Sequence, residues 1–119
     1  MKIAVTSRGT DLDAQVDPRF GRAAYIIIVD TETLDFEVLD NQTNVNAFKG
    51  AGIQAASMVS DKGANILLTG FCGPNAFNTL KAANVKVISD VSGSVKDAVK
   101  SFNDNKLSFV DQPNKDGHW

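Results

Sequence analysis

The sequence predicts an α/β fold in which three helices pack on a mixed five-stranded sheet. Five short runs of apolar and β-branched residues are typical of strands, and three segments with helical spacing of apolar residues follow the third, fourth and fifth runs. Two initial antiparallel connections followed by alternating helices and strands indicate a mixed sheet. With a central first strand and right-handed crossovers, the strand order becomes 3-2-1-4-5 and strand 2 is antiparallel.

The first half of the chain supplies three strands. Lys2–Thr6 and Ala23–Val29 are rich in residues that favour strands, and a polar loop with glycines and aspartates separates them. Leu34–Leu39 alternates apolar with acidic residues before it ends in leucine. This pattern predicts a strand that forms a hairpin with the preceding one and has one face exposed to solvent.

The second half alternates helices with strands. A helix is expected from about Ala47 or Gly50 to Asp61, with Gly63 as its C-cap. Pro74 suits the first turn of a helix, and Ser92-Gly93-Ser94 can cap another. The remaining elements are the strand Ala64–Thr69, the helix Pro74–Ala83, the strand Val85–Ser89 and a helix from the Ser94 cap to about Asn103. We expect one domain over residues 1–105 and a mobile tail over 106–119.

The predicted topology brings four loops to one edge of the sheet. Strands 1 and 4 lie side by side, and the chain leaves them in opposite directions, which is where open α/β sheets place their ligands. The loops 7–22, 41–50, 70–74 and 89–94 should all reach this edge, together with the N-termini of all three helices. Helix N-termini carry unpaired N–H donors and positive dipole ends, so the edge should favour an anion.

Composition excludes several classes of function. The chain has 119 residues, a net charge of −2 and a pI near 5.2, which disfavours nonspecific nucleic-acid binding. No apolar run is long enough to cross a membrane, and the N-terminus lacks a signal-peptide pattern. A single cysteine cannot form an internal disulfide, so we expect a cytoplasmic protein.

Three motifs give the chain a family resemblance. They are Val16-Asp17-Pro18-Arg19-Phe20-Gly21-Arg22-Ala23, Gly50-Ala51-Gly52-Ile53-Gln54-Ala55-Ala56 and Leu68-Thr69-Gly70-Phe71-Cys72-Gly73-Pro74-Asn75-Ala76. Their order and spacing resemble the dinitrogenase iron–molybdenum cofactor biosynthesis family, which includes NifX-like proteins and the C-terminal domain of NifB-like proteins, over roughly residues 1–103. The resemblance implies a ribonuclease-H-like fold and the binding or carriage of a metal–sulfur cluster or its precursor.

Within that family, Cys-Gly-Pro after the fourth strand and the Gly-His-Trp ending look most like the orange-protein subgroup. That likeness implies a molybdenum–copper sulfide cluster held without conventional covalent ligation; otherwise the cargo would be an iron–molybdenum cofactor precursor. The ligand inventory agrees, because protein-ligated iron–sulfur clusters need about four thiolates and this chain has one cysteine, one histidine and two methionines. A preformed thiometallate anion needs only N–H donors, cations and a shaped pocket.

Each candidate residue has a functional and a structural interpretation. Arg19 could hold the anion or pair with Asp11, Asp13 or Asp17, and we prefer a structural role for Arg22. Phe20 should pack beneath the loop, and Gly21 should supply an unusual backbone angle or a close approach. The proposed cluster-binding residues are Arg19, Phe20, Gly21, Arg22, Asn44, Gly50, Gly52, Gly70, Phe71, Cys72 and Gly73.

Two side chains are candidate metal ligands. Cys72 could ligate metal or be a reactive thiol whose pKa is lowered by the helix N-terminus, although a lone cysteine is usually a small buried residue. His118 could donate a nitrogen to copper or molybdenum, although a solvated histidine in the tail is the simpler interpretation.

The function expected from the sequence is non-enzymatic binding, storage or delivery of a molybdenum-containing metal–sulfur cluster. Its partners would be the cluster or thiomolybdate and proteins that donate or accept the cluster, with no nucleic acid and no membrane. One alternative is a regulatory or adaptor domain that binds a protein without metal. A more distant one is a hydrolase that uses Asp11, Asp13, Asp17 and Asp90, although the first strand carries no central acid.

Overall fold

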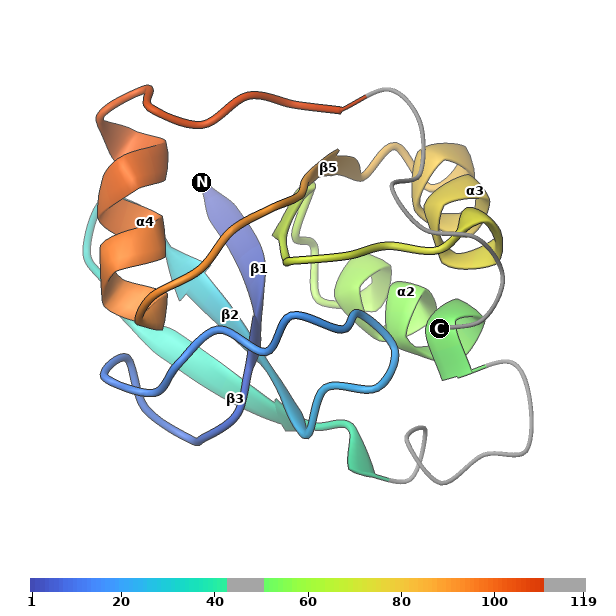
Figure 1. Ribbon diagram of the computed structural model, residues 1–119, viewed down its shortest axis with the longest axis horizontal. Coiled ribbons are helices and arrows are strands. Elements are labelled where there is room, and N and C mark those ends of the chain that lie inside the picture. Colours follow the sequence, from blue (N-terminus) through green and yellow to red (C-terminus); the bar gives the residue numbers. More distant parts are fainter. Residues whose placement is uncertain (43–50, 111–119) are drawn as a thin grey trace.

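A five-stranded sheet in the order β3-β2-β1-β4-β5 forms the centre of the computed structural model, which describes residues 1–42 and 51–110 (Figure 1). Strand β1 pairs antiparallel with β2 and parallel with β4, β3 pairs antiparallel with β2, and β5 pairs parallel with β4. The strands are β1 Lys2–Ser7, β2 Tyr25–Asp30, β3 Phe36–Asp40, β4 Ile66–Leu68 and β5 Lys86–Ile88, and the helices are α2 Ala51–Asp61, α3 Pro74–Ala82 and α4 Val95–Asn103. The predicted order of elements and the mixed sheet are confirmed.

The helices form a layer on each face of the sheet, with α2 and α3 on one side and α4 on the other (Figure 1). Because successive side chains of a strand point to opposite faces of the sheet, the apolar residues of each strand pack alternately against the two helix layers. Ala4 and Leu67 face α2 and α3, whereas Ile3, Val5 and Leu68 face α4. The central strands are therefore buried on both faces, which explains their nearly continuous apolar runs.

Strand register sets the edge at which the loops gather. Ser7 lies opposite Tyr25, and Tyr25 lies opposite Asp40. The carboxyl ends of β1, β3, β4 and β5 therefore meet the start of β2 at one edge, as predicted. Figure 1 shows the loops after β1, β4 and β5 at this side of the sheet, which we call the carboxyl edge.

Several boundaries differ from the prediction. Strand β2 begins at Tyr25 rather than Ala23, because the carbonyl of Ala23 accepts a hydrogen bond from a side chain rather than joining the ladder. Residues beyond position 105 also contact the folded part of the chain. Leu107 packs against the core beneath α4, and the Val110 N–H donates to Val87 O at 2.9 Å on the outer side of β5. Residues 111–119 of the expected tail lie outside the described residues.

No helix in the described part of the chain is both long enough and apolar enough to span a membrane.

Candidate functional site

The loop that carries the Arg-Phe-Gly motif is fastened between β1 and the segment after β4. Asp17 N–H donates to Thr6 O at 3.0 Å, which fixes the loop where β1 ends. Phe71 N–H donates to Pro18 O at 2.6 Å, and Phe20 N–H donates to Phe71 O at 3.1 Å. These two bonds pair the motif with residues 70–71 as a short parallel bridge, so two of the sequence motifs are parts of one structure.

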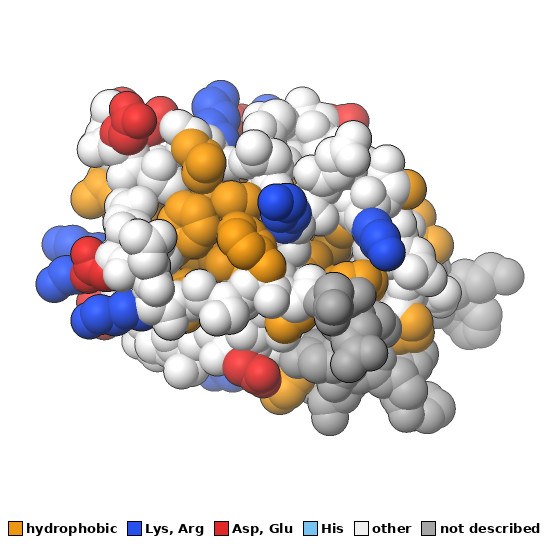
Figure 2. Space-filling view, turned by 90° about the horizontal axis from the view of Figure 1, so that it is seen from above, with side chains coloured by type: hydrophobic (Ala, Val, Ile, Leu, Met, Phe, Trp, Pro, Cys, Tyr) orange, Lys and Arg blue, Asp and Glu red, His pale blue; other side chains and the backbone are white. Residues whose placement is uncertain are grey.

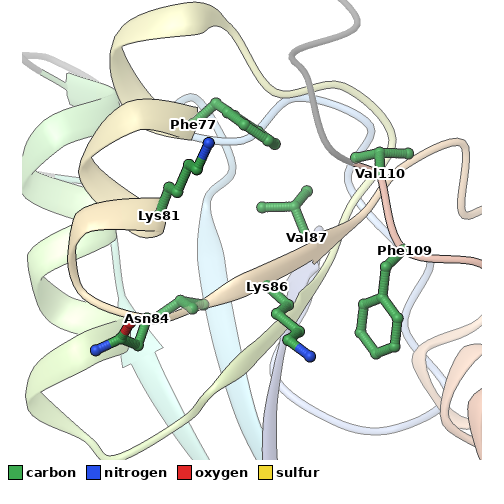
Figure 3. Close-up of a pocket in the computed structure, with 8 residues that line it drawn as sticks. Phe77, Lys81, Asn84, Lys86, Val87, Phe109 and Val110 are labelled. Carbon is green, nitrogen blue, oxygen red and sulfur yellow. The ribbon is translucent and has the colours of Figure 1, made fainter.

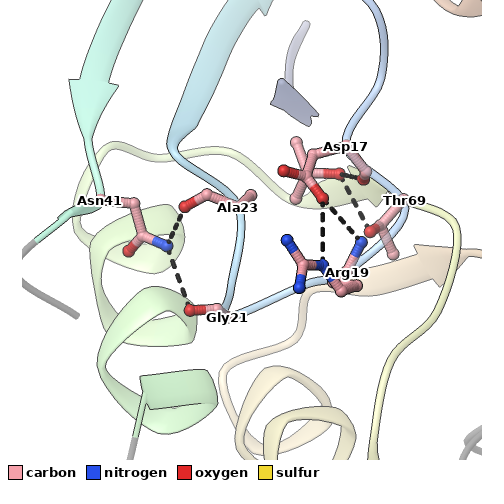
Figure 4. A network of polar contacts seen from close by, with 7 residues as sticks. Asp17, Arg19, Gly21, Ala23, Asn41 and Thr69 are labelled. Atoms are coloured by element: carbon pink, nitrogen blue, oxygen red, sulfur yellow. Dashed lines mark hydrogen bonds and ion pairs between the residues drawn. The ribbon is translucent and has the colours of Figure 1, made fainter. Parts of the chain in front are cut away.

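A buried pair of hydroxyl groups lies at this junction; Thr69, which carries one of them, is labelled in Figure 4. Thr6 Oγ1 lies 2.6 Å from Asp17 O and 3.0 Å from Thr69 Oγ1. Because a hydroxyl carries one proton, Thr6 donates to the carbonyl of Asp17 and accepts from Thr69. Both threonines are fully buried, so the network fixes the distance between the ends of β1 and β4.

Three glycines bring the motif loops and helices into van der Waals contact. A Cβ on Gly70 would lie 2.7 Å from both Cα and O of Pro18. Gly21 has φ of +88°, and its Cβ would lie 2.9 Å from Cα of Gly52. A Cβ on Gly52 would in turn lie 2.9 Å from Cβ of Ala76 in α3. The space that these glycines leave is filled by the protein itself, so their structural interpretation is the one that the packing supports.

Asn41 holds the other end of the motif loop and was missed by the sequence analysis. Its side chain is fully buried, and Nδ2 donates to Ala23 O at 2.8 Å and to Gly21 O at 3.3 Å (Figure 4). The available signal was a lone amide two residues after the end of an expected strand. Its partners are 18 and 20 residues away, so local sequence patterns do not reveal them.

Arg19 is paired with Asp17, one of the three aspartates considered from the sequence. Its Nε lies 3.8 Å from Asp17 Oδ1, and the same carboxylate oxygen accepts its backbone N–H at 3.0 Å (Figure 4). The Asp17 side chain is only 7% exposed, whereas the Arg19 side chain is 51% exposed. An ion pair this exposed is worth at most about 1 kcal/mol. Asp17 therefore orients Arg19 while solvent, or an anion, can still reach the guanidinium.

The neighbouring candidates differ in exposure. Phe20 is 2% exposed and packs in the core with Phe77 and Cys72, which is the packing role expected for it. Arg22 and Phe71 are half-buried. Gly73 is the N-cap of α3 and is also half-buried. The candidates Asn44, Gly50 and His118 lie outside the described residues.

The helix N-termini are not equivalent, which corrects the expectation that all three offer donors to an anion. At α4, Val95 N–H donates to Ala14 O and Lys96 N–H donates to Leu12 O, each at 2.8 Å. Asp97 N–H donates to the Ser94 side chain at 3.0 Å. The loop after β1 thus satisfies the α4 donors that we expected to face a ligand.

The N-terminus of α3 is open by comparison. Gly73 supplies no side-chain cap and Pro74 has no N–H, so the first donors are those of Asn75 and Ala76. Neither backbone N–H has a hydrogen-bond partner among residues 1–42 and 51–110. This helix end follows Phe71, whose backbone is paired with the motif around Arg19.

Cys72 lies inside the fold. It is 1% exposed, and its Sγ lies 3.8 Å from Gly73 O. Burial raises the pKa of the thiol to about 12, the opposite of the lowering considered for a reactive thiol at a helix N-terminus. Without a metal ion the side chain is therefore a neutral thiol near neutral pH, which disfavours nucleophilic attack because the thiolate is the nucleophile.

Other polar groups lie at or near the carboxyl edge. Ser89, directly after β5, has a buried Oγ with no hydrogen-bond partner in the described part of the chain. Within the same residues, no three His, Cys, Asp or Glu side chains lie close enough to hold a metal ion. Of the aspartates considered for a hydrolase, Asp17 serves the Arg19 turn, and Asp11 accepts the backbone N–H of Asp13 at 3.0 Å.

Comparison with known proteins gives a consistent result. Residues 1–105 match the family described as dinitrogenase iron–molybdenum cofactor. The fold is similar to that of the apo form of the orange protein from Desulfovibrio gigas, with 45% identity, 96% of each chain covered and a TM-score of 0.93. It is also similar to a candidate NifB protein from Thermotoga, with 35% identity, a TM-score of 0.80 and 96% and 98% of the two chains covered. An uncharacterized protein of Methanocaldococcus jannaschii is 28% identical over 96 residues, which are 78% of this chain and 80% of that protein.

Proposed function

This chain belongs to the dinitrogenase iron–molybdenum cofactor family, and from that premise we propose that it binds a molybdenum-containing sulfide cluster as cargo. The cluster would be stored or delivered and not chemically converted. It would lie at the carboxyl edge of the sheet and be held largely without bonds from protein atoms to metal. In such a complex sulfide completes the coordination of the metals, and the protein recognises the outer surface of an anion.

The observation that carries this proposal is the open N-terminus of α3 beside Arg19. The N–H groups of Asn75 and Ala76 lie at the positive end of the α3 dipole. The half-exposed guanidinium of Arg19 adds a full positive charge that Asp17 neutralises only in part. Charge-assisted hydrogen bonds from such donors are roughly twice as strong as neutral ones, and they suit a multiply charged thiometallate.

The chemistry of the remaining donors supports noncovalent holding. Cys72 is the only sulfur ligand that the family motif places at this edge, and burial keeps its pKa near 12. A bond from Cys72 to metal would require loss of this proton and access to a side chain that is 1% exposed, so we favour binding through sulfide and N–H contacts.

The identity of the cargo rests on similarity. The likeness to the Desulfovibrio gigas orange protein supports a molybdenum–copper sulfide cluster, as the orange-protein-like sequence features imply. The family description keeps an iron–molybdenum cofactor precursor as the second candidate. Both are sulfide-rich anions, so the same donors would serve either one.

The test is an anaerobic titration of the metal-free protein with tetrathiomolybdate and a copper(I) salt, followed by gel filtration, visible spectroscopy and elemental analysis. We expect saturable charge-transfer bands, with molybdenum and copper coeluting with the protein. The Arg19→Ala variant should retain less cluster at nearly unchanged folding stability, whereas Lys100→Ala on α4 controls for the loss of one positive charge. Cys72→Ala should keep the wild-type spectrum.

Absence of retained colour in the wild-type protein would reject the molybdenum–copper cluster. Unchanged retention in Arg19→Ala together with a large loss of stability would assign Arg19 to loop structure alone. A Cys72→Ala variant that loses the spectrum while it remains folded would contradict noncovalent holding.

A further inference from the structure

Two adjoining hollows lie on the β5 side of the molecule. The first, of about 410 Å³, lies between α3 and the segment 109–110, with Val85 and Val87 among its lining residues (Figure 3). The second, of about 340 Å³, lies where β4 and β5 begin and is lined by Ile66, Leu107 and other residues. Phe109, Lys86 and Asn84 line both, so the hollows form one continuous surface. We call this surface the β5 groove.

The β5 groove contains large apolar side chains that are exposed to solvent. Met1 and Phe109, which contribute to it, are 55% and 50% exposed. Figure 2, which views the molecule from this side, shows apolar side chains gathered into a patch with basic side chains next to it. Contiguous apolar patches with a polar rim are characteristic of protein interaction sites.

The charges of the groove all have one sign. Lys81 and Lys86 line the first hollow, and no Asp or Glu lines either one. Within residues 1–42 and 51–110 neither lysine has a carboxylate partner, whereas Lys62 is paired with Glu37. Lys86 Nζ instead lies 5.3 Å from the centroid of the Phe109 ring. In a protein with a net charge of −2, this local excess of positive charge favours acidic groups.

The backbone of the β5 edge is already partly occupied. Val110 N–H donates to Val87 O at 2.9 Å, so the segment after α4 covers the middle residue of this short strand. A partner could not add a full strand here without displacing that segment. Recognition must come from side chains that enter the two hollows beside it.

We propose that the β5 groove docks a segment of a partner protein in which apolar side chains alternate with carboxylates. Two apolar side chains would fill the two hollows on either side of Phe109, and the carboxylates would meet Lys81 and Lys86. The second hollow lies at the starts of β4 and β5, and the first extends along α3 as far as Phe77. The inference does not depend on what binds at the open end of α3.

The test uses the full-length ¹⁵N-labelled protein and defined peptides. The probe is the capped peptide Glu-Phe-Glu-Leu-Glu, compared with analogues in which lysine replaces each glutamate or serine replaces each apolar residue. We expect saturable amide shifts around Lys81, Lys86 and Phe109 with the acidic apolar probe and none with the two analogues. Affinity should fall as salt is raised, because the contacts join opposite charges.

Variants locate the site. The double variant Lys81→Glu/Lys86→Glu should weaken probe binding roughly tenfold or more, since each attraction becomes a repulsion. The matched control Lys96→Glu/Lys100→Glu makes the same charge change at two α4 residues that line neither hollow, and it should bind within about twofold of wild type. Phe109→Ala should also weaken binding, and thermal melts should show that all three proteins remain folded.

Four outcomes would overturn the proposal. They are no saturable binding of the acidic apolar probe, equal binding of its lysine analogue, shifts confined to residues 16–22 and 70–76, and equal weakening by both double variants. Equal affinity for free 3-phenylpropionate would identify a small-molecule pocket instead. Concentration-dependent dimerisation that Phe109→Ala abolishes would identify a second copy of the chain as the occupant.

Discussion

Replacing Gly21 with alanine tests the contact that joins the motif loop to α2. The left-handed backbone of Gly21, at φ +88°, costs a non-glycine residue about 1–2 kcal/mol. The new Cβ would also lie 2.9 Å from Cα and 3.0 Å from N of Gly52, and these are backbone atoms that cannot rotate away. Forcing such atoms apart costs roughly 1–3 kcal/mol more. The free energy of unfolding should therefore fall by about 2–5 kcal/mol.

Gly63→Ala is the matched control for this variant. Gly63 has φ of +77°, but nothing lies within 4 Å of the position of its Cβ, so only the backbone cost applies. Urea titrations of both variants, followed by circular dichroism, would give the two losses in unfolding free energy. The Gly21→Ala loss should exceed the Gly63→Ala loss by at least about 1 kcal/mol. Equal losses would show that the loop moves away from α2 without cost and would refute the close-contact argument.

Three further predictions concern Asn41, the Ser94 cap and Cys72. Asn41→Ala should lower the unfolding free energy by about 1–3 kcal/mol in chemical denaturation, because it leaves the carbonyls of Gly21 and Ala23 without their donor. Ser94→Ala should lower it by about 1 kcal/mol through loss of the α4 cap, and Ser92→Ala, at an exposed position before the cap, should change it little in the same assay. Burial raises the pKa of Cys72 from 9.0 to about 12. Below pH 9 the thiol is protonated in both the folded and the unfolded chain, so its contribution to stability is fully present. Between pH 9 and about 12 only the unfolded chain loses the proton, which favours unfolding. Stability should fall there by up to about 1.4 kcal/mol per pH unit, and by less in Cys72→Ala, when melts are compared across that range.

The fold was predictable because its signals are local. Runs such as Ile26–Val29 are apolar on both faces since both faces are covered, and Pro74 and Gly63 mark where helices begin and end. The strand order then followed from the hand of crossovers and the order of elements. Boundaries were less accurate, because the end of a strand depends on which partner its last carbonyl meets. Ala23 illustrates this, since its carbonyl pairs with Asn41.

The candidate site was only partly predictable, because its details depend on contacts between distant segments. The backbone angle and close approach of Gly21 could be anticipated from a glycine between bulky residues. The satisfied donors of α4 could not, since their acceptors, Leu12 and Ala14, lie in an irregular loop without a recognisable pattern. The protonated state of Cys72 follows from its burial by groups on several elements, which a glycine-rich motif does not reveal.

The close contacts among Pro18, Gly70, Gly21, Gly52 and Ala76 have a consequence for how proteins of this type are classified from genomes. These residues lie within the three motifs, and their small size lets the loops and helices meet. A sequence could therefore keep every motif and still carry a different metal cargo, or none. Assignments of the cargo are better based on the positions that the packing leaves accessible, such as Arg19 and Asn75.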